Sequence, residues 1–102
     1  MRAVKVQYTV KPEFAEENKT NIQKVMSALN TNPIVGMQYS SYTDNDNPNT
    51  FIHINMAKDE ETMSKLSDLQ EFTAFRMALK ASQPLSPPKQ TTLNLVGAGF
   101  SM

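Results

Sequence analysis

The sequence predicts a single α+β domain, residues 1–102, in which four antiparallel strands form one sheet and two helices cover one of its faces. Three observations predict this class. Apolar residues alternate with polar residues in four short segments, and they recur with helical spacing in two longer ones. The six segments follow one another in the order strand, helix, strand, strand, helix, strand. A chain of 102 residues accommodates one such domain and leaves little over.

The first strand and the first helix occupy the N-terminal third. Residues 2–11 alternate, with four apolar or aromatic side chains on one side, namely Val4, Val6, Tyr8 and Val10. Pro12 ends this strand and suits the start of a helix, which we predict over residues 13–30. Acidic residues lie in its first turns, where the helix dipole favours negative charge. Its apolar stripe contains Phe14, Ile22, Val25, Met26 and Leu29.

The middle of the chain predicts two strands joined by a long polar loop. The second strand covers residues 34–43 and the third covers 51–57. The residues between them are mainly Asp, Asn, Pro and Thr, which favour turns. In the third strand Ile52, Ile54 and Met56 alternate with Phe51, His53 and Asn55. The first of these sets is the more apolar, so we expect it to face the helices.

The second helical region is predicted to break in two. Asp59 is a favourable N-cap, and Asp68 followed three residues later by Glu71 resembles a second capping box. We therefore expect a kink near Ser67 and a helix over residues 69–82 that carries Phe72, Phe75 and Leu79. Prolines prevent the helix from continuing through residues 84–88, and the last strand is predicted at residues 90–97.

The two faces of the predicted sheet differ in polarity. The helix-covered face is expected to carry Val4, Val6, Tyr8, Val10, Val35, Met37, Tyr39, Ile52, Ile54, Met56, Leu93 and Leu95. The opposite face is expected to carry Lys5, Gln7, Thr9, Gln38, Ser40, Tyr42, His53, Asn55, Thr92 and Asn94. That second set is polar but almost uncharged, unlike most solvent-facing surfaces. It predicts either an open wet face on a monomer or the contact surface of a twofold homodimer, and we favour the homodimer.

Composition excludes several classes of function. Ten basic and ten acidic residues cancel, which argues against nucleic-acid and membrane-surface partners. The chain has no cysteine, so no disulfide, thiolate nucleophile or cysteine-bound metal is expected, and a reducing cytoplasmic location fits. No apolar run approaches the roughly 20 residues that cross a bilayer, and the N-terminus becomes polar too early for a secretory signal. RNA binding is also disfavoured, because the expected open face lacks stacking aromatics on its central strands.

The chain resembles a known family over nearly its whole length. The element order is that of ferredoxin-like βαββαβ domains, and the most specific stretches are residues 51–63 (FIHINMAKDEETM) and 67–75 (SDLQEFTAF). A strand, an acidic helix start, a kink and two aromatics three residues apart resemble the dimeric α+β barrel proteins. Within that group they resemble the antibiotic-biosynthesis-monooxygenase-like (ABM-like) domains. The resemblance implies a homodimer and suggests cofactor-independent oxygenation of a small aromatic or quinone-like metabolite.

Several positions depart from the pattern of that family. Asn55 stands where many relatives have a glutamate, Ala57 where an aromatic is common, and Leu66 where a helical histidine is common. The chain also has no tryptophan, which the haem-degrading relatives pair with that histidine. These departures argue against haem degradation. They also mean that the polar groups for the oxygenase chemistry of the family are only partly present.

Four residues are the candidate catalytic groups: His53, Asn55, Tyr39 and Arg76. His53 is the only histidine, and an imidazole titrates near neutral pH. The alternative for His53 and Asn55 is a hydrogen-bonded role in a dimer contact. Tyr39 and Tyr8 are expected on the helix side, where their hydroxyls either meet a ligand or find a local partner. No metal or cofactor site is predicted, because Asp44-Asn45-Asp46-Asn47 lacks the rest of a calcium loop.

Two functional hypotheses follow from the sequence. In the first, the protein is a small cofactor-independent enzyme, an oxygenase or isomerase that acts on an aromatic or quinone-like metabolite. In the second, it is a noncatalytic homodimer that binds a small molecule or stabilises a partner.

Overall fold

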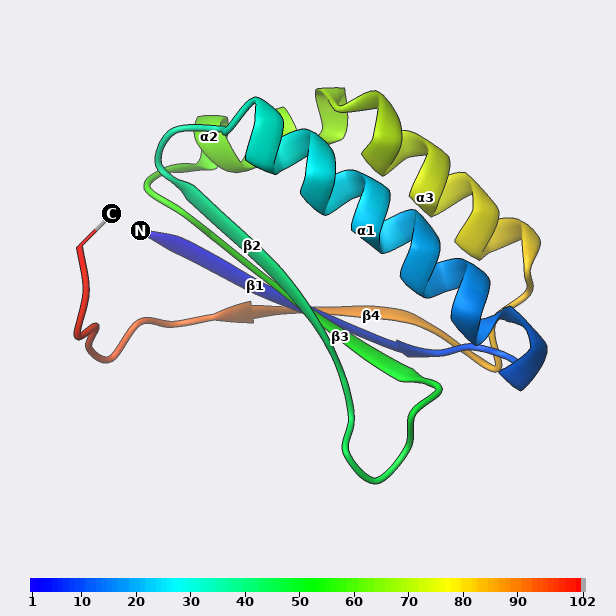
Figure 1. Ribbon diagram of the computed structural model, residues 1–102. Coiled ribbons are helices and arrows are strands. Elements are labelled where there is room, and N and C mark those ends of the chain that lie inside the picture. The colour runs from blue at the N-terminus through cyan, green and yellow to red at the C-terminus, as the bar shows by residue number, and fades with distance from the viewer. Residues whose placement is uncertain (102) are drawn as a thin grey trace.

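The computed structural model describes residues 1–101 and has the predicted order of elements (Figure 1). The elements are β1 (Arg2–Thr9), a 3₁₀ turn (Pro12–Phe14), α1 (Ala15–Thr31), β2 (Met37–Thr43), β3 (Thr50–Ala57), α2 (Glu60–Ser64), a second 3₁₀ turn (Lys65–Asp68), α3 (Gln70–Ala81) and β4 (Ser86–Leu93). The α+β, ferredoxin-like prediction is confirmed. In the described residues, no helix is long and apolar enough to cross a membrane.

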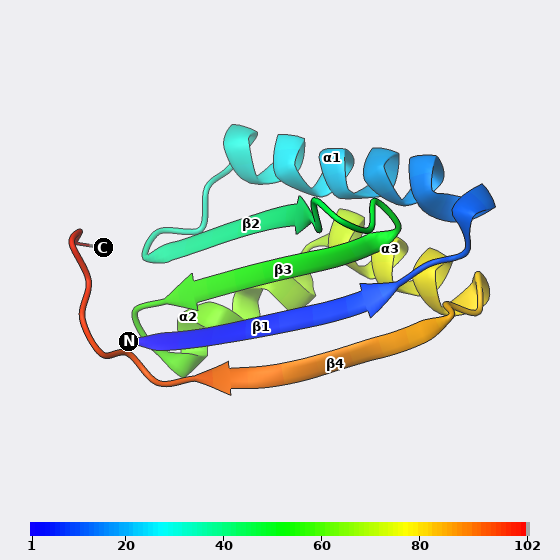
Figure 2. The same cartoon turned by 90° about the horizontal axis from the view of Figure 1, so that it is seen from below.

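The sheet has four antiparallel strands in the order β2-β3-β1-β4, as Figure 2 shows from the open side. Residues directly opposite each other in an antiparallel pair share a face of the sheet. Val6 of β1 pairs with His53 of β3, and His53 pairs in turn with Ser41 of β2. These pairs place Tyr8, His53 and Ser41 on one face of the sheet.

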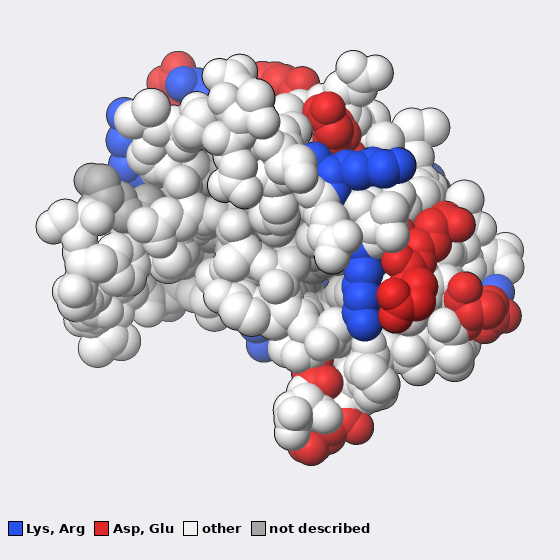
Figure 3. All heavy atoms as spheres, viewed as in Figure 1, with Lys and Arg blue, Asp and Glu red and all other residues white. Residues whose placement is uncertain are grey.

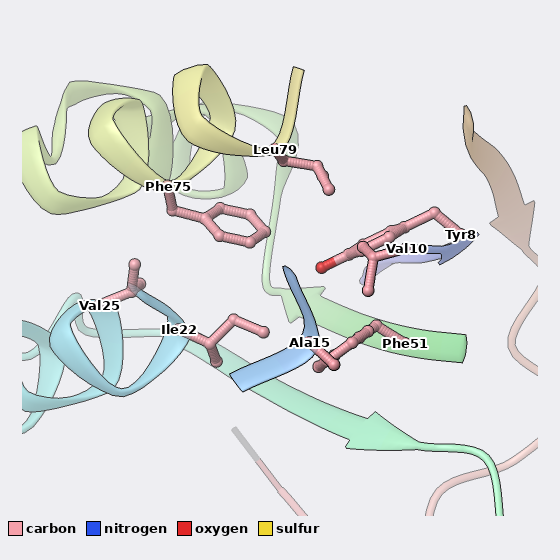
Figure 4. Packing of buried hydrophobic residues seen from close by; sticks show 8 residues of the cluster. All are labelled: Tyr8, Val10, Ala15, Ile22, Val25, Phe51, Phe75 and Leu79. Carbon is pink, nitrogen blue, oxygen red and sulfur yellow. The ribbon is translucent and has the colours of Figure 1, made fainter. Parts of the chain in front are cut away.

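Helices α1 and α3 pack side by side on that face, and the other face is left uncovered (Figures 1 and 2). The core between the helices and the sheet joins residues from both helices and from β1 and β3, shown in Figure 4: Tyr8, Val10, Ala15, Ile22, Val25, Phe51, Phe75 and Leu79. The stripe predicted for the first helix therefore reaches the core as expected, through Ile22 and Val25 in particular.

The turn before β2 shortens that strand relative to the prediction. Residues 34–36 are not part of it, and Val35, expected on the helix side, is 81% exposed. Gly36 has φ 82°, a left-handed conformation that glycine adopts without strain. A Cβ on Gly36 would lie 2.7 Å from Cδ of Lys58. The carbonyl of Gly36 accepts a hydrogen bond from the backbone N–H of Lys58, which anchors the turn to the end of β3.

The last strand begins four residues earlier than predicted and ends earlier too. It spans Ser86–Leu93, so Asn94 and Leu95 lie beyond it. Pro87 and Pro88 are tolerated because β4 is an edge strand, where a missing N–H donor need not break the ladder. The register with β1 shifts between Gln7 and Thr9, so the prolines coincide with a local bulge.

The break in the second helical region is confirmed, but one of its two predicted caps is wrong. Asp59 caps α2 by accepting a hydrogen bond from the backbone N–H of Thr62 at 2.7 Å. That bond holds the pKa of the Asp59 carboxyl below its usual value. The chain then leaves the α conformation near Ser67, as expected. The N-cap of α3 is Leu69, without a side-chain bond, so Asp68 and Glu71 do not form a capping box.

The predicted facing of β3 and β4 is wrong by one residue. Phe51 and His53 are buried under the helices, whereas Ile52, Ile54 and Met56 share the open face with Ala3, Lys5 and Gln7. In β4, Leu93 pairs with Ala3 on the open face and Thr92 pairs with Val4 on the helix face. A shift of one residue moves every side chain of a strand to the other face. The open face is therefore more apolar than expected.

Candidate functional site

His53 lies at the centre of the helix-covered side and not on the open face. It is 3% exposed, and three hydroxyl groups surround its ring. Nε2 lies 2.8 Å from the hydroxyl of Tyr8. Nδ1 lies 2.6 Å from Oγ of Ser41 and 3.0 Å from the hydroxyl of Tyr39. Both ring nitrogens are thus engaged, by residues from the two strands that flank β3.

Helix α1 contributes a fifth polar group to this cluster. Asn18 is fully buried, and its Nδ2 donates a hydrogen bond to the hydroxyl oxygen of Tyr8 at 2.8 Å. Tyr8 is 1% exposed, and its hydroxyl points into the core cluster in Figure 4. The result is a continuous chain of hydrogen bonds from Asn18 through Tyr8 and His53 to Ser41 and Tyr39. We call these five residues the His53 network.

Aromatic rings hold the imidazole of His53 in place. The rings of Tyr8 and Tyr39 stack on either side of it, at centroid distances of 5.3 Å and 5.8 Å. Phe75 of α3 packs against it at 5.4 Å. Aromatic neighbours on adjacent strands stabilise a sheet through such contacts. The orientation of the His53 ring is therefore fixed by packing as well as by hydrogen bonds.

The His53 network is uncharged at neutral pH. Burial disfavours the charged form of each group. It lowers the pKa of His53 to about 4. It raises the pKa of Tyr8 and of Tyr39 well above that of a free tyrosine, although hydrogen bonds from Asn18 and Ser41 oppose the rise. The network can therefore donate and accept hydrogen bonds but carries no fixed charge for an ionic ligand.

A cavity of about 730 Å³ lies beside the network, between α1 and the edge strand β2. Its apolar lining comes mainly from α1, the turn after it and the strands: Ile22, Met26, Leu29, Ile34, Met37 and Phe51. Tyr39 and Ser41 also line it, so two hydroxyl-bearing side chains that contact His53 border the cavity. An apolar cavity with a few convergent polar groups is the usual form of a small-molecule site.

The structure brings two of the four predicted catalytic residues together. Tyr39 and His53 are hydrogen-bonded, and the predicted helix-side position of Tyr39 is confirmed. Asn55 is opposite Tyr39 on the same face, but its Oδ1 has no hydrogen-bond partner and it does not line the cavity. Arg76 is exposed, with its guanidinium carbon 5.7 Å from the centre of the Phe72 ring, and it does not line the cavity either. Gln7 faces away from His53, contrary to expectation.

Sequence reasoning missed Ser41 and Asn18. Ser41 could have been found from Tyr39, because residues two apart in a strand share a face. Asn18 lies between Phe14 and Ile22 at four-residue intervals, on the stripe predicted to be buried. A polar residue on a buried helical stripe needs a hydrogen-bond partner, so its position was the available signal. In residues 1–101 no group of three or more His, Cys, Asp or Glu side chains is arranged to hold a metal ion.

Comparison with solved structures identifies the fold. One antibiotic biosynthesis monooxygenase superposes with a TM-score of 0.80 at 17% identity, over 95% of this chain and 100% of its own. A candidate antibiotic biosynthesis monooxygenase from Deinococcus radiodurans gives a TM-score of 0.78 at 18% identity, over 100% and 99% of the two chains. The protein Rv0793 from Mycobacterium tuberculosis gives 0.81 at 11% identity, over 97% and 98%.

Comparison of the sequence with models of known protein families and with curated proteins gives no match. At the identities above, structural similarity establishes the fold and leaves the activity open. The arrangement of four antiparallel strands with helices on one face extends over nearly the full length of each of the three solved structures. The chain therefore has the ABM-like α+β fold.

Proposed function

We propose that this protein is a homodimer that binds a small aromatic or quinone-like molecule in the cavity between α1 and β2. The observation that carries the proposal is the junction of the cavity with the His53 network. Tyr39 and Ser41 line the cavity and also lie within 3.0 Å of Nδ1 of His53. The volume of the cavity, about 730 Å³, is in the usual range for small-molecule sites. The lack of charge in the network favours a neutral ligand.

Two hydroxyl groups provide the test of this site. Ser41→Ala and Tyr39→Phe are each expected to weaken binding of a naphthoquinone probe by roughly tenfold, the equivalent of one lost hydrogen bond. Titration calorimetry and thermal shift measure the effect. Ser27→Ala, an exposed change on α1 outside the cavity lining, is the matched control and should bind as the unaltered protein does. Failure of the unaltered protein to bind naphthoquinone or naphthol would contradict the proposal.

Cofactor-independent oxygenation is the second candidate function, and the ABM-like fold together with the Ser41–His53 contact favours it. A phenol-type ligand would give its hydroxyl proton through Ser41 to Nδ1 of His53. The resulting anion would stabilise the imidazolium and so oppose the effect of burial on its pKa. Dioxygen would then accept four electrons, with one oxygen atom becoming the second quinone carbonyl and the other leaving as water. The chemistry requires an unprotonated Nδ1.

Dioxygen uptake distinguishes the two functions. With naphthol as substrate, an oxygenase consumes dioxygen and forms quinone in a ratio of one to one, and His53→Gln abolishes both while the fold persists. A protein that only binds its ligand shows stabilisation by naphthol or naphthoquinone without uptake. The low pKa of His53 makes it a weak base in the ligand-free protein and favours binding without chemistry.

The open face of the sheet supports the homodimer. Ile52, Ile54 and Met56 form an apolar row on β3, and Leu93 of β4 is 38% exposed. Beyond β4, Leu95, Val96 and Phe100 are exposed as well. Figure 3 shows the lower margin of the molecule, between the C-terminal segment and the acidic loop that joins β2 to β3, with little charge apart from one basic group beside that loop. A half-buried apolar row flanked mostly by polar residues on both neighbouring strands suits contact with another protein surface, and a twofold dimer is the simplest such arrangement.

A charge in the centre of that face is expected to separate the subunits. Light scattering on a sizing column should give about twice the chain mass of 11.4 kDa for the unaltered protein. Ile54→Lys should give the single-chain mass, because it places a second lysine beside Lys5, its cross-strand neighbour. Val35→Lys is the matched control, since Val35 is 81% exposed in the turn before β2, and it should leave the mass unchanged. A single-chain mass for the unaltered protein would overturn the dimer.

A further inference from the structure

The proton arrangement in the His53 network follows from Tyr8. The amide nitrogen Nδ2 of Asn18 can only donate, and it donates to the hydroxyl oxygen of Tyr8. The hydroxyl of Tyr8 has one proton, and its other partner is Nε2 of His53 at 2.8 Å. If Nε2 were protonated, the Tyr8 oxygen would accept from both neighbours and its own buried proton would have no acceptor among the described residues. That proton therefore goes to Nε2, which acts as an unprotonated acceptor.

The tautomer of His53 is then determined. A neutral imidazole has one protonated and one unprotonated nitrogen, and the hydrogen bonds of the ring select between them. Burial keeps His53 neutral at neutral pH. With Nε2 accepting from Tyr8, the ring proton resides on Nδ1. Nδ1–H donates to Oγ of Ser41 at 2.6 Å or to the hydroxyl of Tyr39 at 3.0 Å.

The orientation of the Asn18 amide decides this arrangement. In the structure Oδ1 of Asn18 has no partner and Nδ2 is bonded. The reversed amide would bond Oδ1 to Tyr8 and leave both N–H donors of a fully buried residue without that partner. Buried N–H groups without a partner are rarer in proteins than under-satisfied carbonyl oxygens. The reversed amide would also reverse every proton along the network, because Tyr8 would then donate to Asn18 and accept from Nε2.

The proton on Nδ1 of His53 affects the cavity because it determines how the hydroxyls of Tyr39 and Ser41 can bond. Nδ1 already has a proton, so neither hydroxyl can donate to it. The two hydroxyls also hydrogen-bond to each other, so one of their two protons is used within the pair. Both residues line the cavity, so the remaining hydroxyl proton is free to serve a ligand there.

We infer that Asn18 is a positioning residue that sets the tautomer of His53, and that the Tyr39–Ser41 pair consequently offers a hydrogen-bond donor to the cavity. The ligand class that matches a hydroxyl donor is a molecule with an accepting oxygen, such as the carbonyl of a quinone or an aromatic ketone. This inference rests on the proposed binding site and specifies its preference. It also separates the two functions, because base catalysis through Ser41 needs the opposite tautomer.

Nitrogen NMR of protein labelled with ¹⁵N-histidine tests the tautomer without any ligand. The chain has one histidine, so the two ring signals are unambiguous. At neutral pH the expected pattern is a protonated Nδ1 and an unprotonated Nε2. The reverse pattern, or two protonated nitrogens, would overturn the inference whether or not a ligand binds.

The role of Asn18 is tested in the same measurement. Asn18→Leu removes the donor to Tyr8 and should shift part of the population to the Nε2-protonated form. Asn21→Leu on the same helix, where the side chain contributes nothing to the network, should leave the wild-type pattern. An unchanged pattern in a folded Asn18→Leu variant would overturn the role of Asn18. If that variant fails to fold, the pattern of the unaltered protein still decides the tautomer.

Matched ligands test the donor preference. Naphthoquinone, which only accepts hydrogen bonds, should bind at least about tenfold more tightly than naphthalene, which has no polar group. Equal affinity for the two would overturn the donor assignment. Tighter binding of naphthol than of naphthoquinone would also overturn it, since naphthol can donate to an accepting network. Absence of binding by all three would refute the proposed cavity function, while the NMR pattern would still report on the tautomer.

Discussion

Removal of the Tyr8 hydroxyl is expected to lower the free energy of unfolding by about 3 kcal/mol. Tyr8→Phe keeps the ring and its stacking on Phe51 and His53 but deletes the atom that both Asn18 Nδ2 and His53 Nε2 use. Each buried polar group left without a partner costs about 1–3 kcal/mol. A domain of this size has only about 5–15 kcal/mol of stability. The loss is measured by urea unfolding at neutral pH.

Tyr42→Phe is the matched control for this prediction. Tyr42 is 55% exposed, and its hydroxyl donates only to Oγ of Ser40 on the surface. The same chemical change there should alter the free energy of unfolding by no more than about 0.5 kcal/mol. The double change Tyr8→Phe with Asn18→Leu should lower the free energy of unfolding by less than the sum of the two single changes. Removing both partners of a hydrogen bond leaves neither of them as an unpaired buried polar group. Additive losses would show that the two residues do not act through their hydrogen bond.

The order of the elements could be predicted from the sequence because it depends on local signals. Alternation at β1, the prolines after α3 and the N-cap Asp59 each determine a boundary from neighbouring residues alone. The facing of β3 could not be predicted in the same way. Both of its alternating sets contain large side chains, and the more apolar one was assigned to the core. The cross-strand partners of His53 decide the question, and they lie 12 to 45 residues away in sequence.

The candidate site was accordingly found in part. His53 is a candidate because it is the only histidine, and Tyr39 because its helix-side position points its hydroxyl toward a possible ligand. Arg76 is a candidate only if its side chain turns inward from the second helix, and in the structure it is exposed on α3 and does not line the cavity. The error at β3 also changes the character of the open face. Isoleucines and a methionine occupy that face in place of His53 and Asn55, so the proposed homodimer would form through a more apolar contact than the sequence predicts.

A second large effect is expected from pH, and His53 is its cause. The pKa of a histidine imidazole is 6.5 in the absence of structure, as in the unfolded chain, and that of His53 is about 4 in the folded protein. Between these values the unfolded chain binds a proton that the folded chain does not. Stability therefore rises with pH in this interval and falls as the medium becomes more acidic. The full effect below both values is about 3 kcal/mol, and lowering the pH from about 7 to about 5 should cost about 2 kcal/mol.

The interval from pH 7 to pH 5 isolates this group. His53 is the only histidine. Carboxyl groups titrate mostly below this range, and the pKa of Asp59 is lowered further. The groups that face the ring, Tyr8 and Tyr39, stay neutral because burial raises their pKa. Urea unfolding of His53→Gln should therefore give a nearly flat profile from pH 7 to pH 5, whatever its absolute stability. A flat profile in the unaltered protein would mean that His53 binds its proton equally in the folded and unfolded chains, and burial would then not lower its pKa.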